Sequence, residues 1–191
     1  MKVIIGLIGE NGSGKETFTN ILEGLIPDVS KERVRTGDIL RDILNLLFLP
    51  KTRANLQLLA KILRDGISPD VLARAAFHRI EQTQADIVIL DGMRWPPEVN
   101  ILREFPHNFL IYISADPKIR FQRLRSRKEK EGEGEMSYEQ FLKEEHAPAE
   151  ELIKNLAENA DVTIINDGNL ENLRLQVEQF YNHNLRSILK G

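Results

Sequence analysis

The sequence predicts a doubly wound α/β domain in which helices flank a five-stranded parallel sheet. Short runs rich in Val and Ile alternate with longer amphipathic segments along the chain, and this alternation is typical of a parallel sheet wrapped by helices. Four of the five runs are almost continuously apolar, as strands covered on both faces must be. The chain has 191 residues, so we expect a single domain over 1–191.

The five runs predict strands, and the amphipathic segments between them predict helices. The expected strands are 3–8, 33–35, 86–90, 108–114 and 161–165, of which the second is short and polar. The expected helices are 15–25, 38–48, 52–65, 69–83, 97–104, 117–128, 138–158 and 169–187. Because Pro148 interrupts a helix, the segment 138–158 should form two helices that meet near His146 and Ala147.

Composition excludes several classes of protein. The 26 basic and 29 acidic side chains leave a formal charge of −3, which argues against a dedicated nucleic-acid binder. There is no cysteine, so disulfides, zinc knuckles and thiolate nucleophiles are excluded. The four histidines are far apart and lack the spacing of metal ligands. The apolar runs are too short to span a bilayer. The first expected strand begins at residue 3, which leaves no room for a signal peptide, so we expect a cytoplasmic protein.

A glycine-rich loop follows the first expected strand and opens a helix. Such a loop curls around a phosphate with its backbone N–H groups pointing inward, and side chains would block that approach. The following helix presents its free N–H groups and positive dipole end to the same anion. The residues expected to bind the phosphates of ATP are Gly9, Asn11, Gly12, Ser13, Gly14, Lys15, Glu16 and Thr17. Lys15 would bridge the β- and γ-phosphates.

The Gly-Lys-x-Thr order of this loop resembles the adenylate kinase and nucleoside monophosphate kinase group of P-loop proteins. Glu16 stands where many such loops carry a magnesium-binding Ser or Thr, and the hydroxyl comes one position later, at Thr17. Mg²⁺ keeps several of its waters, so we expect it to be held largely through water by Thr17 and Asp91. Asp91 ends an apolar strand, where open α/β sheets bind ligands. The resemblance adds Asp38 to this water shell.

Two further segments resemble the acceptor side of the same group. The first resembles the Thr-Gly-Asp-x-Leu-Arg segment of adenylate kinases, which implies that the acceptor is bound by Thr36, Gly37, Asp38 and Arg41. A capped helix would explain these residues in part. The second, 91–94, resembles an Asp-Gly-x-x-Arg segment that places Arg94 on the acceptor phosphate. Here the arginine comes one residue sooner, which resembles dephospho-coenzyme A kinase-like and deoxynucleotide kinase-like relatives more closely.

The leucine-rich helices that follow predict an acceptor-binding helical insertion over 38–84, most of it scaffold. Trp95 either stacks on an acceptor base or covers the end of the strand.

A basic segment predicts a lid. Seven of the 13 residues from 118 to 130 are Lys or Arg. The segment 116–128 resembles the Arg-x-x-x-Arg lid helix of monophosphate kinases, which implies that Arg123 and Arg127 clamp the transferred phosphoryl group. Arg120 is a further candidate, and a solvated charged face is the alternative. We expect a short lid over 123–145, whose closure would exclude water.

These motifs predict a magnesium-dependent enzyme that transfers a phosphoryl group from ATP to a (deoxy)nucleoside monophosphate. The expected catalytic residues are Lys15, Arg94, Arg123 and Arg127. The partners would be ATP and a small phosphorylated acceptor, with no membrane or nucleic acid. A kinase for dephospho-coenzyme A or another small molecule is one alternative, and an ATP-binding or ATP-hydrolysing switch or assembly factor is another. The two acceptor-side motifs favour a kinase, since a switch does not need them.

Overall fold

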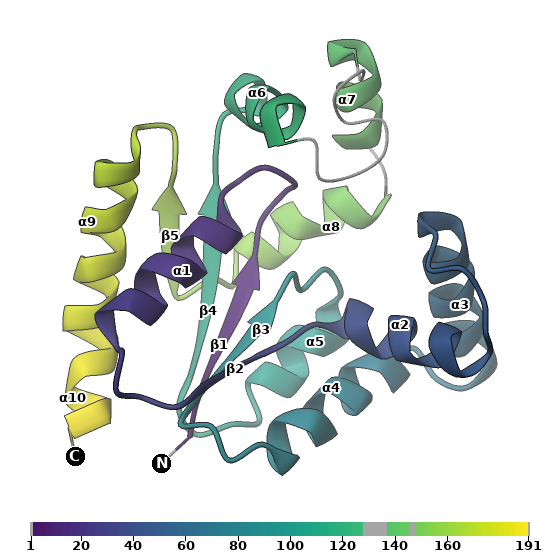
Figure 1. The fold of residues 1–191 in the computed structure, drawn as a ribbon, viewed down its shortest axis with the longest axis horizontal. Helices are drawn as coiled ribbons and strands as arrows, with labels where there is room; N and C mark the ends of the chain where they lie inside the picture. Colours follow the sequence, from purple (N-terminus) through teal and green to yellow (C-terminus); the bar gives the residue numbers. More distant parts are fainter. Residues whose placement is uncertain (1, 128–136, 146–147, 191) are drawn as a thin grey trace.

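The computed structural model describes residues 2–127, 137–145 and 148–190 of the chain. Its sheet is parallel throughout and has the strand order β2-β3-β1-β4-β5. The strands are β1 (Val3–Ile8), β2 (Lys31–Val34), β3 (Ile87–Asp91), β4 (Asn108–Ser114) and β5 (Val162–Ile165). β1 lies at the centre of the sheet, with β3 and then β2 on one side and β4 and then β5 on the other (Figure 1). The predicted five-stranded, doubly wound α/β fold is therefore confirmed.

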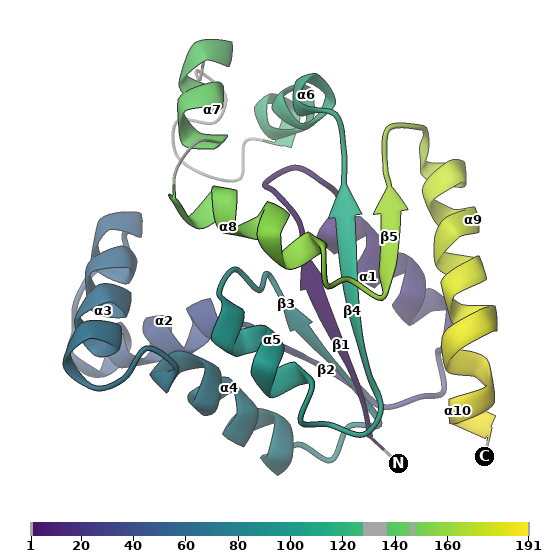
Figure 2. The ribbon, with the colours of Figure 1, turned by 180° about the vertical axis from the view of Figure 1, so that it is seen from behind.

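Helices cover both faces of this sheet (Figures 1 and 2). Apolar side chains of β1 alternate between the faces: Ile4 and Ile8 join one core, and Val3, Ile5 and Leu7 join the other. The first core contains residues of α2 (Thr36–Leu46), α3 (Arg53–Gly66), α4 (Val71–Gln82), α5 (Pro96–Leu102) and α8 (Pro148–Ala157). The second contains residues of α1 (Lys15–Leu25), α9 (Leu170–Phe180) and the π-helical turn η1 (Tyr181–Leu185), which leads into α10 (Arg186–Lys190).

Some element boundaries differ from the prediction. β2 begins at Lys31 rather than at 33, and α2 begins at Thr36 rather than at 38. Arg35 has extended backbone angles (φ −124°, ψ 129°) and is the N-cap of α2, so it separates the two elements. The segment predicted to contain two helices holds α7 (Tyr138–Glu145) and α8, and their junction at 146–147 lies outside the described residues.

Gly6 in the middle of β1 lets α5 pack close to the sheet. A Cβ atom at this position would lie 2.6 Å from Met93 Sδ and 2.7 Å from a methyl carbon of Leu102. Because interiors are packed without room for an extra methyl group, glycine is needed here. The close approach brings the loop between β3 and α5 beside the loop that follows β1.

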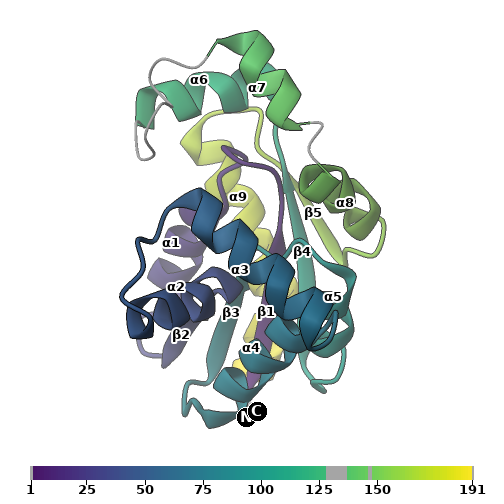
Figure 3. The same ribbon diagram turned by 90° about the vertical axis from the view of Figure 1, so that its right-hand side faces the viewer.

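The carboxyl ends of the parallel strands meet at one edge of the sheet. The segments 9–14, 92–95 and 166–169 leave the sheet there, and α6 (Pro117–Arg127) and α7 lie above this edge (Figure 3). Open α/β sheets bind ligands at this edge. The fold therefore brings the glycine-rich loop after β1 and the segments 92–95 and 166–169 to the same edge.

The turn between α2 and α3 exposes consecutive apolar side chains. Leu46, Leu47, Phe48 and Leu49 are all exposed, and Phe48 keeps 96% of its accessible surface. Phe48 also has a positive φ of 56°, which is costly for a bulky residue.

None of the helices in the described ranges combines the length and the apolar character needed to cross a membrane.

Candidate active site

The loop of residues 9–14, here called the phosphate loop, packs closely against residues that are distant in the sequence. A Cβ atom on Gly12 (φ 79°) would lie 2.9 Å from the carbonyl oxygen of Arg120, and one on Gly14 (φ 104°) would lie 2.2 Å from Nδ2 of Asn166. Asn166 Nδ2 donates a buried hydrogen bond of 2.8 Å to the carbonyl oxygen of Ser13. Glycine is thus required both by the backbone angles and by the neighbours.

Of two side-chain donors at the phosphate loop, Lys15 forms hydrogen bonds to the loop itself, and Ser13 has no partner among the described residues. Lys15, the first residue of α1, donates from Nζ to the carbonyl oxygens of Gly9 (2.7 Å) and Glu10 (3.1 Å). The hydroxyl of Ser13 is buried without a hydrogen-bond partner among the described residues. Since buried hydroxyl groups are normally paired, this donor suits an oxygen of a bound anion. The predicted ATP-binding residues thus form a loop with the donors that a phosphate needs.

Three arginines converge on the outer part of the phosphate loop. Arg94 Nη2 donates to Asn11 Oδ1 (3.3 Å), and Arg120 Nη1 lies 3.4 Å from the carbonyl oxygen of Asn11. Arg123 Nη1 lies 3.5 Å from the carbonyl oxygen of Gly12, and its Nη2 donates to that of Asn166 (2.9 Å). Burial lowers the pKa of both Arg94 and Arg123. A bound anion would compensate for this lost solvation.

Arg120 links α6 to α7. It is only 3% exposed, and it pairs through both terminal nitrogens with the Glu145 carboxylate on α7, with 2.7 Å from Nη1 to Oε1. Burial alone would lower the pKa of Arg120, but the hydrogen bonds and charge of Glu145 outweigh it and raise the pKa. Arg127 ends α6, and its side chain lies outside the described residues, as does the whole of 128–136 in the predicted lid. Arg120 therefore holds α7 against α6 and also places a positive charge beside the phosphate loop.

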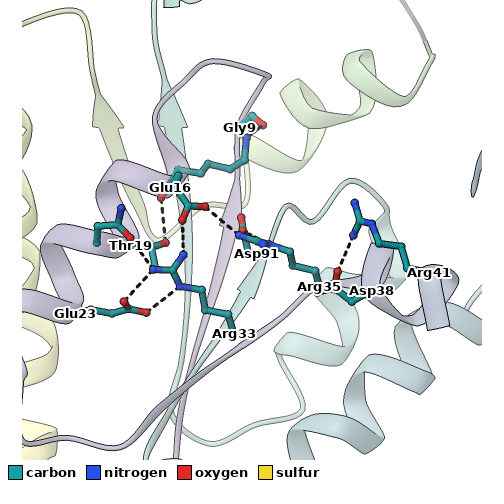
Figure 4. A network of polar contacts seen from close by, with 11 residues as sticks. Gly9, Glu16, Thr19, Glu23, Arg33, Arg35, Asp38, Arg41 and Asp91 are labelled. Carbon is teal, nitrogen blue, oxygen red and sulfur yellow. Dashed lines mark hydrogen bonds and ion pairs between the residues drawn. The ribbon is translucent and has the colours of Figure 1, made fainter. Parts of the chain in front are cut away.

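An ion-pair network surrounds the start of α1 (Figure 4). Arg33 Nη1 and Arg35 Nη2 donate to the two carboxylate oxygens of Glu16, at 2.7 and 3.0 Å. The Arg33 hydrogen bond lowers the pKa of Glu16. Arg35 also donates from Nε to Asp91 Oδ2 (2.7 Å). Glu16, predicted among the phosphate-binding residues, is thus paired with Arg33 and Arg35. The Asp91 carboxylate, predicted to hold the metal ion, is hydrogen-bonded to Arg35.

The predicted acceptor residues are connected through a residue that the sequence analysis missed. Glu98 is 3% exposed and accepts hydrogen bonds from Thr36 Oγ1 (2.7 Å), the Arg94 backbone N–H (2.7 Å) and the Trp95 backbone N–H (3.0 Å). It links the start of α2 to the loop before α5. A signal existed, since a Glu at the third position of a helix often accepts from the N-cap N–H.

The other predicted acceptor residues lie at the start of α2. Asp38 accepts a 2.6 Å hydrogen bond from Arg41 Nη1, and both side chains are exposed (Figure 4). Gly37 lies beside them, since a Cβ on it would be 3.3 Å from Arg41 Nη1. The structure thus brings Thr36 and Arg94 together through Glu98, while Arg41 contacts Asp38 on the exposed surface of the helix.

Residues that could hold a metal ion are few. In the described part of the chain, no three His, Asp or Glu side chains gather into a metal-binding group. Thr17 lies half-buried in the first turn of α1, and the side chain of Asp91 is 11% exposed. Hydroxyl and carboxylate oxygens are the donors that Mg²⁺ accepts, so these residues fit an ion that takes most of its ligands from phosphate and water.

Comparison with known proteins finds full-length relatives, although no family model matches the chain. A UPF0200 protein of Methanoregula boonei is 34% identical over 176 residues, which cover 91% of this chain and 93% of that protein. A UPF0200 protein of Methanothermobacter thermautotrophicus is 28% identical over 178 residues, covering 93% and 88%.

Two solved structures with a similar fold are shikimate kinases. The enzyme of Bacteroides thetaiotaomicron has a TM-score of 0.63 at 14% identity, covering 94% of this chain and 97% of its own. The enzyme of Acinetobacter baumannii, in complex with shikimate, has a TM-score of 0.55 at 16% identity, covering 100% and 94%. At these identities the similarity shows the fold alone, which this chain shares with the two shikimate kinases.

Proposed function

The chain belongs to the UPF0200 family, and from its site we propose that it transfers the γ-phosphoryl group of ATP to a small phosphorylated acceptor, with a (deoxy)nucleoside monophosphate as the first choice. The observation that carries the proposal is the convergence of cations on one loop. Lys15 contacts the start of the phosphate loop, and Arg94 and Arg123 contact its outer part. A loop that only binds nucleotide needs no arginine from the acceptor side.

The chemistry requires alignment and charge stabilisation more than proton transfer. An acceptor phosphate oxygen forms a bond to the γ-phosphorus, and the bond from that phosphorus to the β–γ bridging oxygen breaks, so that ADP leaves. The acceptor oxygen is already negatively charged, and no side chain needs to remove a proton. Lys15 and Arg123 would stabilise the transferred group, and Arg94 would hold the acceptor phosphate beside it. Arg127 and the lid over 123–145 are proposed to assist.

We also propose Mg²⁺ as the cofactor. Thr17 and Asp91 would hold it through water, with Asp38 more distant in the same shell. When bound, the ion neutralises part of the phosphate charge. Because Asp91 is bonded to Arg35, the guanidinium must share or release that carboxylate when the ion is present.

The decisive experiment measures ADP production from ATP and magnesium. Ribo- and deoxyribonucleoside monophosphates, dephospho-coenzyme A and shikimate are added one at a time. We expect one acceptor to accelerate turnover strongly, and Lys15→Ala to lower that rate by at least about 100-fold. Lys154→Ala, an exposed lysine on α8, is the matched control and should retain full activity.

The same panel separates the alternatives. Acceleration by dephospho-coenzyme A or shikimate alone would show a kinase for a hydroxyl acceptor, a class that the likeness to shikimate kinases makes worth including. If no acceptor raises turnover above the rate with ATP alone, the kinase proposal is wrong. A switch or assembly factor, whose ATPase activity responds to a macromolecule, would then be the better hypothesis.

A further inference from the structure

Arg64, in the last turn of α3, lies against Trp95. Its guanidinium carbon is 4.1 Å from the centroid of the Trp95 ring, a distance at which a cation is attracted to the face of an indole. Arg64 is half-buried, and α3 belongs to the insertion predicted to bind the acceptor. The sequence analysis left open whether Trp95 stacks on a ligand or covers the strand end, and the structure shows it in contact with an arginine.

The guanidinium of Arg64 lacks hydrogen-bond acceptors. Among the residues that the structure describes, none accepts a hydrogen bond or forms an ion pair with it, although arginine has five N–H donors. The nearby charge that attracts it is Glu98, but the carboxylate of Glu98 bonds to Thr36 and to the backbone of Arg94 and Trp95. Burial lowers the pKa of Arg64. A desolvated cation of this kind is stabilised by an added anion.

Contact with an aromatic ring does not use up the N–H donors of an arginine. Contact with an aromatic ring can use the face of a guanidinium, while its N–H donors lie in the plane at its edge and match the two oxygens of a carboxylate or phosphate. The backbone of Trp95 is held in place, because its N–H donates to Glu98 and two prolines follow. Little reorganisation is therefore needed to bind an anion here.

The position relates this stack to the proposed reaction. Trp95 directly follows Arg94, whose side chain reaches Asn11 in the phosphate loop. An acceptor whose reacting phosphate lies at Arg94 can therefore extend along this loop toward α3.

We propose that Arg64, supported by Trp95, is a second oxyanion site for the acceptor, which binds a carboxylate or phosphate group other than the one that receives the phosphoryl group. This inference rests on the proposed function, because it assigns the anion to the acceptor. Within the proposed class of phosphorylated acceptors, it favours compounds that carry a second anionic group. A nucleoside monophosphate would still bind through the Arg94 site but would leave the Arg64 site unfilled.

Trp95 provides a direct readout, because it is the single tryptophan of the chain. Its emission is titrated with inorganic phosphate and, separately, with malonate, against sodium chloride at equal ionic strength. The titrations are made in Lys15→Ala protein, so that anion binding to the phosphate loop contributes less. We expect a saturable change of emission with at least one of the two anions, and the tighter one identifies the group as phosphate or carboxylate.

Variants of Arg64 assign the binding to this side chain. Adding Arg64→Gln should raise the Kd by about tenfold or more. Arg64→Lys keeps the charge but loses the planar fork, so it should raise the Kd by a smaller factor. Arg74→Gln, at an exposed arginine of α4 paired with Asp70, is the matched control and should leave the Kd unchanged. An emission change no larger than that with chloride, or an equal Kd for the Lys15→Ala protein with and without Arg64→Gln, would overturn the inference.

Failure of this inference is distinguishable from failure of the proposed function. If an acceptor accelerates ADP production but anion binding does not depend on Arg64, only the second oxyanion site is wrong. If Arg64 binds the anion and no acceptor accelerates ADP production, the site stands as an anion site and its assignment to an acceptor fails with the kinase proposal.

Discussion

Replacing Glu98 by alanine should destabilise the protein strongly, although Glu98 belongs to none of the motifs predicted from the sequence. Its carboxylate is 3% exposed and accepts three hydrogen bonds, from Thr36 Oγ1 and from two backbone N–H groups. Each donor left without a partner costs about 1–3 kcal/mol when it stays buried. The hydroxyl can rotate and the loop can relax toward water, so we take the lower limit for each. The expected loss is about 3 kcal/mol in the free energy of unfolding.

Thermal unfolding followed by circular dichroism measures this loss. For a chain of this size, 1 kcal/mol corresponds to a Tm change of about 2–4 °C, so Glu98→Ala should lower the Tm by about 6–12 °C. Glu98→Gln keeps one acceptor oxygen and should fall between alanine and wild type. The control is Glu178→Ala, which removes a surface pair with Arg174 on α9 worth at most about 0.5 kcal/mol. A Glu98→Ala protein no less stable than the Glu178→Ala control would refute the reasoning.

Three further variants test other features of the structure. Gly14→Ala forces a side chain into φ +104° and against Asn166, so affinity for a fluorescent ATP analogue should fall by about tenfold or more; unchanged affinity would contradict the described loop. Phe48→Asn places a residue that tolerates positive φ at an exposed position, so the urea midpoint should rise by the equivalent of up to about 1 kcal/mol, and not fall. The hydrogen bond from Arg33 lowers the pKa of Glu16 below its ordinary 4.5, so Glu16 stabilises the fold above that pH and loses this contribution as pH falls. Glu16→Gln should therefore show a shallower acid loss of Tm than wild type, and equal slopes would show that the pair contributes nothing.

The fold could be predicted because its strongest signals are local. β1, the phosphate loop and α1 are contiguous, and their order alone places a strand, an anion-binding turn and a helix. The edge strand β2 was harder, since it pairs only with β3. Its residues Lys31, Glu32 and Arg33 can therefore remain polar, and no apolar run marks where it begins.

The site was predicted in outline, and its side-chain pairings were not. The motifs correctly placed Lys15, Thr36 and Arg94 at one edge of the sheet. The partners of these residues are distant in sequence: Glu98 bonds to Thr36 across 62 positions, and Asp91 bonds to Arg35 across 56. Such pairings depend on the packing of helices against the sheet, which periodicity does not specify. The roles predicted for the site residues, Arg41 and Arg127 among them, stay predictions.

The phosphate loop depends on contacts with residues that are synthesised much later than the loop itself. Residues 9–14 leave the ribosome early, but the backbone of Arg120 and the side chain of Asn166 that shape them come much later, the latter 153 positions after Ser13. Such long-range contacts form late, after most chain entropy has been lost. A nascent chain that ends before Asn166 should therefore have little affinity for ATP. Nucleotide binding would then report that folding is complete, and ATP would stabilise finished molecules in preference to partly folded ones.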